Sequence, residues 1–145
     1  MLSIAILSEV VVFLDDARRA ELLYQLMLPF AHRCLVIDGP MCLGSASRPL
    51  GLLATTMGHM DAAARHLEDA LEMNSKIRSP LWVAHTQYDY AHTLLRRGRP
   101  GDRDKAFELL AAALATADEL GLKAVADKTQ RLKHKGEATS SADSA

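Results

Sequence analysis

A pattern of small and large apolar residues returns along this chain at an interval of 43 residues. Each copy has three positions, spaced four and three residues apart, that lie on one face of a helix. The three copies are Ala20/Tyr24/Met27, Ala63/Leu67/Ala70 and Ala106/Leu110/Ala113. A small residue also precedes each copy, at Ser8, Gly51 and Ala91. A fixed interval, with small residues where helices would cross, is typical of stacked helical hairpins.

The composition favours an all-α fold. Hydrophobic residues make up 49% of the 145 residues and aromatic residues only 5%, which indicates helices packed through small side chains rather than a β-sandwich. The net charge of −1 gives no basic surface of the kind that binds nucleic acid or anionic membranes. No uncharged apolar run reaches the ~20 residues that span a bilayer. The two cysteines, Cys34 and Cys42, form no disulfide framework, so we expect a cytoplasmic protein.

Breaks in the pattern divide the chain into three antiparallel hairpins and a closing helix. We expect the hairpins at about 2–31, 42–76 and 80–120, a C-terminal capping helix at 122–134, a repeat domain over 1–135, and a disordered tail at 136–145. Residues 32–42 should form a loop with a brief extended segment, because Asp38-Gly39-Pro40 ends a short apolar run. Pro49 would kink a helix that begins at residue 42, and a start nearer Ser47 is the alternative.

The middle copy resembles the tetratricopeptide repeat at Leu50-Gly51, Gly58, Ala63, Leu67 and Ala70. It departs from that family in three ways. The interval is longer than 34 residues, Ser47 stands at the tryptophan position, and Ala54 stands at the aromatic position of the first helix. The resemblance therefore implies a lengthened variant that folds as a superhelical array.

A narrower resemblance is to the C-terminal repeat region of large bacterial regulators. These proteins join an AAA-type ATPase to an adenylate/guanylate cyclase or to a LuxR-type DNA-binding module. The segments that carry this resemblance are residues 20–29, 42–45, 50–54 and 86–91, and the resemblance spans about residues 5–130. It implies a sensor or docking tail in signal transduction or transcription regulation.

A groove lined by the first helix of each hairpin is the predicted binding surface. Counting from Gly51 and Ala91, its lining should be Arg48, Leu52, Thr55, His85, Tyr88, Asp89, His92 and Arg96. Guanidinium, phenol, imidazole and carboxylate groups in one groove can hold a peptide through charge-assisted hydrogen bonds and an aromatic contact. We therefore expect a non-catalytic module that binds a protein or peptide, and the bland alternative is a groove that is merely solvated.

A small-ligand or metal-responsive sensor is the rival hypothesis. His85, Asp89 and His92 share one helix face, but they offer only three ligands with no fourth in view, so we expect neither a metal nor a cofactor. An enzyme is not expected, because the sequence has no Gly-x-Ser-x-Gly elbow, no HExxH helix and no phosphate-binding loop.

The first helix is apolar over most of its circumference, more than one neighbouring helix can cover. We expect Ile4, Val11, Val12 and Phe13 to form an exposed patch. In an isolated chain we expect a homodimer through this helix, and in a longer parent protein an upstream repeat would cover the patch instead.

Overall fold

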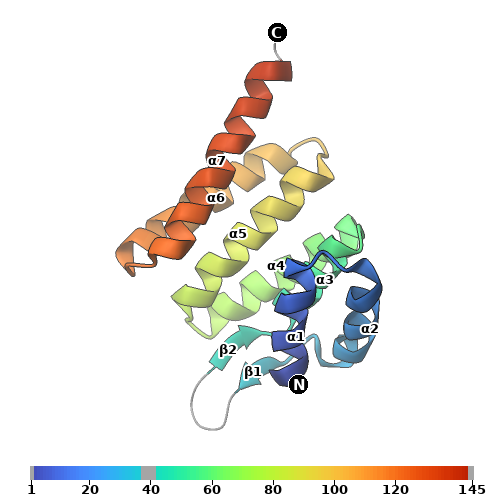
Figure 1. The fold of residues 1–145 in the computed structure, drawn as a ribbon. Coiled ribbons are helices and arrows are strands. Elements are labelled where there is room, and N and C mark those ends of the chain that lie inside the picture. Colours follow the sequence, from blue (N-terminus) through green and yellow to red (C-terminus); the bar gives the residue numbers. More distant parts are fainter. Residues whose placement is uncertain (1, 37–41, 144–145) are drawn as a thin grey trace.

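A computed structural model of the chain describes residues 2–36 and 42–143. These residues form seven α-helices, one short 3₁₀ helix and one two-stranded sheet (Figure 1). None of the described helices is long and apolar enough to cross a membrane. The elements in chain order are α1 (Leu2–Phe13), α2 (Ala17–Met27), η1 (Leu28–Phe30), β1 (Cys34–Val36), β2 (Cys42–Ser45), α3 (Ser47–Thr56), α4 (Met60–Lys76), α5 (Pro80–Arg97), α6 (Asp102–Glu119) and α7 (Lys123–Asp143). The predicted all-α class is confirmed, with the small sheet as an addition.

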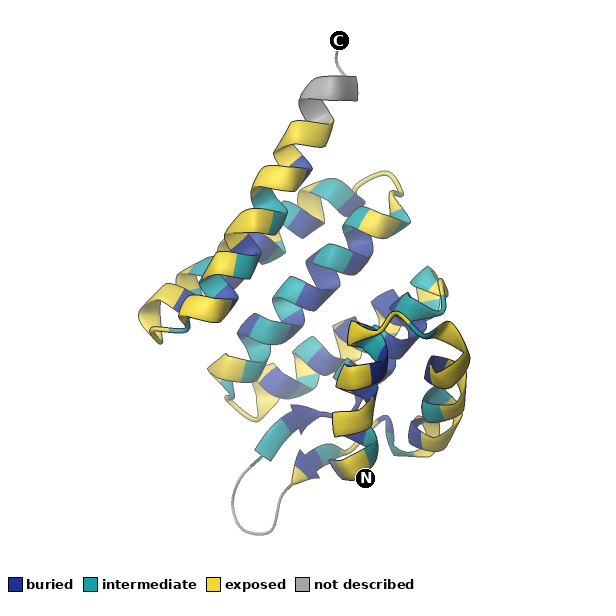
Figure 2. Ribbon diagram, in the orientation of Figure 1, coloured by how far each residue is buried: buried dark blue, intermediate teal, exposed yellow. Residues whose placement is uncertain are grey.

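The helices pack in the order in which they follow one another. α1 contacts α2, α3 contacts α4, α5 contacts α6, and α7 closes on α6. The first helices of successive pairs also touch, because α3 contacts both α1 and α5, and α5 contacts α7. Figure 1 shows the consequence: α1 and α2 lie at one end of the stack and α7 lies at the other. Buried residues lie on the facing sides of the helices, and exposed residues follow the outer sides (Figure 2).

The repeated positions of the sequence lie in the core. Every residue of the three copies is buried except Tyr24, which is half-buried. Ser8, Gly51 and Ala91 are buried as well. Tyr24 stays at the edge because its hydroxyl forms a 2.8 Å hydrogen bond with Nε2 of His66 on α4. The 43-residue interval therefore marks a real seam of helix packing.

The second hairpin begins later than the predicted residue 42. Residues 42–45 form β2, which pairs antiparallel with β1, and α3 begins at Ser47 as in the alternative. Pro49 is then the third residue of the helix, where a backbone N–H has no partner within the helix, so the proline needs no kink. β1 is the predicted extended segment, and residues 37–41 of the predicted loop lie outside the described residues.

The last helix is longer than the sequence predicts. α7 continues through 136–143, where a disordered tail was expected, and residues 144–145 lie outside the described residues. The continuation is held to α6 by Gly136. Its carbonyl accepts a 2.6 Å hydrogen bond from Nη2 of Arg103, and a Cβ added at Gly136 would lie 3.1 Å from Cζ of Phe107. The close contact explains why the helix does not end near residue 134.

Candidate functional site: a basic pocket between α5 and α7

Arg48 and Asp89, both predicted to line the groove, bind each other. Nε of Arg48 donates to Oδ2 of Asp89 at 2.7 Å, and Nη1 donates to Oε1 of Glu9 at 2.7 Å. The Arg48 and Asp89 side chains are only 11% and 8% exposed. Burial lowers the pKa of Arg48, but the two carboxylates raise it by more, so the guanidinium stays charged. This ion pair ties α1, α3 and α5 together and is not free to bind a partner.

Thr55 is also buried rather than in a groove. Its hydroxyl donates to the Gly51 carbonyl at 2.9 Å and lies 2.9 Å from the Thr93 hydroxyl of α5. The prediction was wrong at this position because α5 packs directly over that turn of α3. Leu52, one turn earlier, is half-buried.

The predicted aromatic and imidazole residues of α5 do share one face. The rings of Tyr88 and His92 are stacked with centroids 6.4 Å apart, and those of Trp82 and His85 lie 5.4 Å apart. Lys128 of α7 covers this row, with its Nζ 4.1 Å from the centre of the Tyr88 ring. The sequence analysis missed Lys128 because it lies 40 residues from Tyr88 and no local pattern links the two.

His85 is held in its neutral form by its surroundings. Burial is the main cause that lowers its pKa to about 4, with smaller contributions from the charges of Lys128 and Arg48, while Asp89 acts in the opposite direction. Its Nδ1 is buried without a hydrogen-bond partner in the described part of the chain. The described residues also contain no group of three His, Cys, Asp or Glu side chains placed to hold a metal ion. The structure therefore does not assemble the rival metal site at His85, Asp89 and His92.

A pH titration of stability should report on His85. The pKa is about 6.5 in the unfolded chain and about 4 in the folded one, so the unfolded state takes up the proton first. Stability conferred by the neutral imidazole is present above pH 6.5 and should be lost as the pH falls towards 4. Urea unfolding at several pH values should show that the free energy of unfolding falls less between pH 6.5 and 4 for His85→Gln than for the wild type. Replacement of the exposed His59 by Gln should leave the loss unchanged.

A pocket of about 420 Å³ opens farther along the same two helices. It lies between the C-terminal end of α5, the loop at 98–101, the start of α6 and the last turns of α7. The residues that line this α5–α7 pocket are His92, Leu94, Leu95, Arg96, Gly98, Arg99, Arg103, Leu132, Lys135, Gly136 and Thr139. Three leucines give it an apolar floor, and three arginines and a lysine surround them. No acidic residue is among the lining residues that the structure describes.

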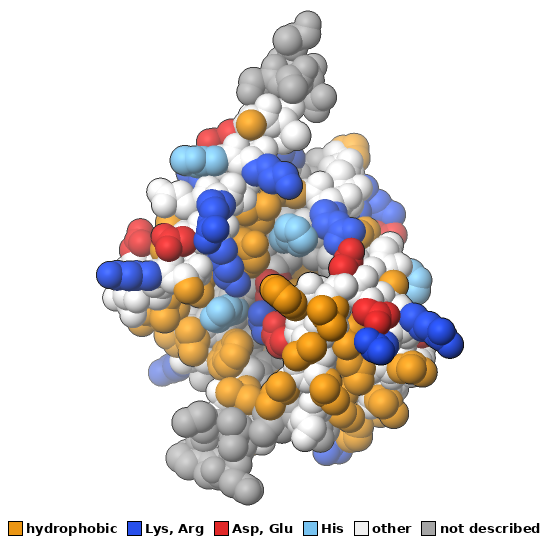
Figure 3. Space-filling model, in the orientation of Figure 1, with side chains coloured by type: hydrophobic (Ala, Val, Ile, Leu, Met, Phe, Trp, Pro, Cys, Tyr) orange, Lys and Arg blue, Asp and Glu red, His pale blue; other side chains and the backbone are white. Residues whose placement is uncertain are grey.

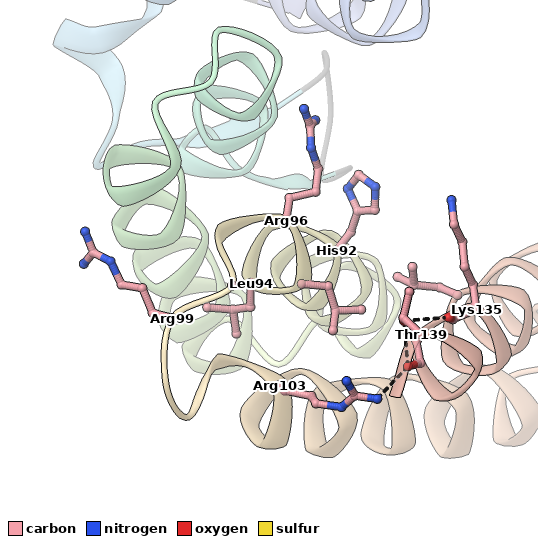
Figure 4. A pocket seen from close by; sticks show the side chains of 11 residues that line it. His92, Leu94, Arg96, Arg99, Arg103, Lys135 and Thr139 are labelled. Atoms are coloured by element: carbon pink, nitrogen blue, oxygen red, sulfur yellow. Dashed lines mark hydrogen bonds between the residues drawn. The ribbon is translucent and has the colours of Figure 1, made fainter. Parts of the chain in front are cut away.

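Two of the four cations are held by other groups. Arg103 donates to the Gly136 carbonyl and stacks over Phe107, and Arg99 pairs with Asp61 at 2.6 Å. Arg96 and Lys135 are exposed and have no ion-pair partner among the described residues. Figure 4 shows both side chains projecting on the same side as His92. The pocket thus presents two uncompensated positive charges beside an apolar floor.

His92 is affected both by burial and by the cations of this pocket. Its pKa is lowered, first by burial and then by the charge of Arg96, with Lys135 contributing in the same direction and Asp89 opposing them. A neutral imidazole beside two fixed cations can donate or accept a hydrogen bond. The pocket can therefore accept a carboxylate at its rim and an aliphatic or aromatic side chain on its floor.

The structure brings together only part of the predicted groove. His92 and Arg96 line the pocket, while His85 and Tyr88 lie in the row under Lys128. The remaining lining residues are Leu94 and Leu95 of α5 together with residues of the loop at 98–101, of α6 and of α7. The only sequence signal that could have indicated part of this lining is the run of four arginines within residues 96–103.

Comparison of the chain with protein-family models, with curated protein sequences and with solved structures found no match. The function has to be inferred from the site itself.

Proposed function

We propose that this protein is a non-catalytic interaction module that binds a peptide segment in the α5–α7 pocket. The observation that carries the proposal is the pairing of an apolar floor with two uncompensated cations, Arg96 and Lys135, in a pocket without an acidic lining residue. The matching peptide carries at least one Asp or Glu next to a Leu, Phe or similar side chain. The site proposed from the sequence is thereby narrowed from a groove of eight residues to its His92–Arg96 end.

The wider role that we propose is that of a sensor or docking part of a bacterial signalling or transcription regulator. Three features support it: the 43-residue interval, the stacked hairpins, and the sequence segments that resemble the repeat regions of such regulators. A tetratricopeptide-like superhelix and a cytoplasmic location belong to the same proposal. Helical repeat arrays of this kind work by presenting an extended surface to a partner.

Selection from a displayed library of random peptides on the immobilised protein tests the binding function. Recovered peptides should be enriched in acidic residues next to large apolar ones. Arg96→Glu combined with Lys135→Glu should weaken binding of a recovered peptide at least about tenfold, because both charges that attract its carboxylate are reversed. Fluorescence anisotropy of the labelled peptide measures the change.

The matched control is Arg18→Glu combined with Lys123→Glu. Both residues are exposed, the change in net charge is the same, and Lys123 lies about three turns of helix away from Lys135. The control should bind as the wild type does. Equal weakening in both double variants would mean that only the overall charge matters, and a library that yields no acidic peptides would contradict the proposal.

A further inference from the structure

The exposed side of α1 and α2 carries an apolar surface that no other described part of the chain covers. We call it the N-terminal face, and its members are 48–88% exposed. They are Ile6, Leu7, Val10 and Phe13 on α1, Leu14 directly after α1, and Leu22 and Leu26 on α2. The four positions of α1 follow the spacing of a single helix face. Figure 3 shows hydrophobic side chains gathered over these two helices.

This surface differs from the patch expected from the sequence. Val11 is buried, and Ile4 and Val12 pack half-buried against the core of α1, α2 and α3. Only Phe13 of the four predicted residues is exposed. The predicted side of the helix faces inward, towards α3, so the residues on its other side are the ones left in solvent.

The size of the N-terminal face fits a protein interface. Its seven large side chains expose roughly 100 Å² each, so the face approaches the ~800 Å² that each partner contributes to a standard interface. On α1 the face carries no charge that burial would leave unpaired, because Glu9 is the only charged residue of that helix and it is already bound to Arg48.

The chemistry of the opposite end of the molecule determines which partner fits. The outer side of α7 is polar, with Lys123, Asp127, Gln130, Arg131 and His134 exposed. Head-to-tail stacking of copies would therefore bury charges against leucines, which is costly. Among the described residues, the other exposed large apolar side chains outside the two N-terminal helices, Leu28, Val36, Ile77, Leu81 and Leu120, form no set as large as the N-terminal face. The surface of this molecule that matches the N-terminal face is the same face of a second copy.

We propose that two copies of the chain pair through their N-terminal faces, with α1 of each packed against α1 and α2 of the other. An interface that uses the same patch twice is isologous, so it closes at two copies and forms no filament. The α5–α7 pocket lies at the other end of the helix stack and stays open in this dimer. The proposal does not rest on peptide binding.

Sedimentation velocity of the purified full chain over a wide range of micromolar concentrations tests the pairing. The wild type should sediment with twice the 15.8 kDa mass of one chain. Val10→Glu combined with Phe13→Glu should give the monomer mass, with a helical circular dichroism spectrum unchanged because both side chains are exposed. Leu120→Glu, a matched change of an exposed apolar residue elsewhere, should remain a dimer.

Leu22→Glu on α2 provides a second variant in case the α1 double variant does not fold, and it too should shift the mass towards the monomer. A monomeric wild type, or a dimer that survives these substitutions in folded protein, would overturn the proposal. Species that grow beyond two copies with concentration would overturn the two-fold arrangement. Peptide binding by the monomeric variant is measured separately, so failure of the dimer and failure of the pocket are distinguishable.

Discussion

Replacing Gly51 with leucine should lower the free energy of unfolding by about 3 kcal/mol, at the upper end of the usual cost of overpacking. A Cβ added at Gly51 would lie 2.5 Å from Cγ and 2.9 Å from Cδ2 of Leu67, and 3.3 Å from the carbonyl oxygen of Ala63. Leu67 is fully buried and the Ala63 carbonyl is backbone, so neither can retreat without moving α4. Thermal and urea unfolding measure the loss.

Gly51→Ala is the sharper variant, because the two effects that act on it have opposite signs. Helix propensity alone predicts that alanine stabilises a helix interior by about 1 kcal/mol relative to glycine. The contact with Leu67 predicts a net loss. Ala111→Leu, on the exposed side of α6, is the control for adding bulk and should change stability by less than about 0.5 kcal/mol. A more stable Gly51→Ala protein would show that α3 and α4 do not cross closely at Gly51.

Asp89→Ala should cost about 3 kcal/mol, because it leaves the Arg48 guanidinium buried without its main partner. The remaining carboxylate, Glu9, is 52% exposed, so its ion pair with Arg48 is worth much less. Glu9→Ala is therefore the matched control, with an expected loss of less than about 1 kcal/mol. Urea unfolding of the wild type and these two variants gives the differences in the free energy of unfolding, compared with the same dependence on urea concentration for all three.

A double variant separates loss of the ion pair from loss of packing. Adding Arg48→Met to Asp89→Ala removes the unpaired charge and keeps an apolar side chain of similar length. Part of the lost stability should return, because a buried charge without a partner costs more than its replacement by an apolar group. If the double variant were less stable than Asp89→Ala, the unpaired charge of Arg48 would not be what destabilises the single variant.

The helices and their contacts could be predicted from the sequence because their signals are local. Proline at the start of α5 and glycine at 121, after the end of α6, mark those boundaries within a few residues of the observed ones. The close approach at Gly51 follows from one small residue opposite the Ala63/Leu67 seam. Each of these signals depends on spacing within one helix or one hairpin, which a periodic pattern records.

Contacts between distant segments could not be predicted in this way. Ser45 of β2 donates its backbone N–H to Oδ1 of Asn74 at 2.9 Å, and Nδ2 of Asn74 donates to the Thr86 hydroxyl at 3.0 Å. Asn74 is completely buried, yet nothing near it in the sequence indicates a core residue. This amide holds a strand where the sequence favoured a helix.

Only part of the candidate site could be predicted from the sequence, for the same reason. Helical spacing predicts His85, Tyr88, Asp89 and His92 on one side of α5, but it could not show that Arg48 neutralises Asp89 or that Lys128 covers Tyr88. The second wall of the pocket lies on a stretch of α7 whose polar composition resembles a flexible tail. Contact with α6 through Gly136 decides its structure, and that contact joins residues more than 30 positions apart.

The most direct test of the proposed function is a residue-by-residue NMR titration of the ¹⁵N-labelled protein with a peptide recovered from the display selection. The largest amide shifts should fall in the last turns of α5, in the loop at 98–101, and at 132–139 of α7, and they should disappear in the Arg96→Glu/Lys135→Glu variant. Shifts centred on α1 and α2, or no shifts at concentrations where the peptide binds, would contradict the α5–α7 pocket as the binding site.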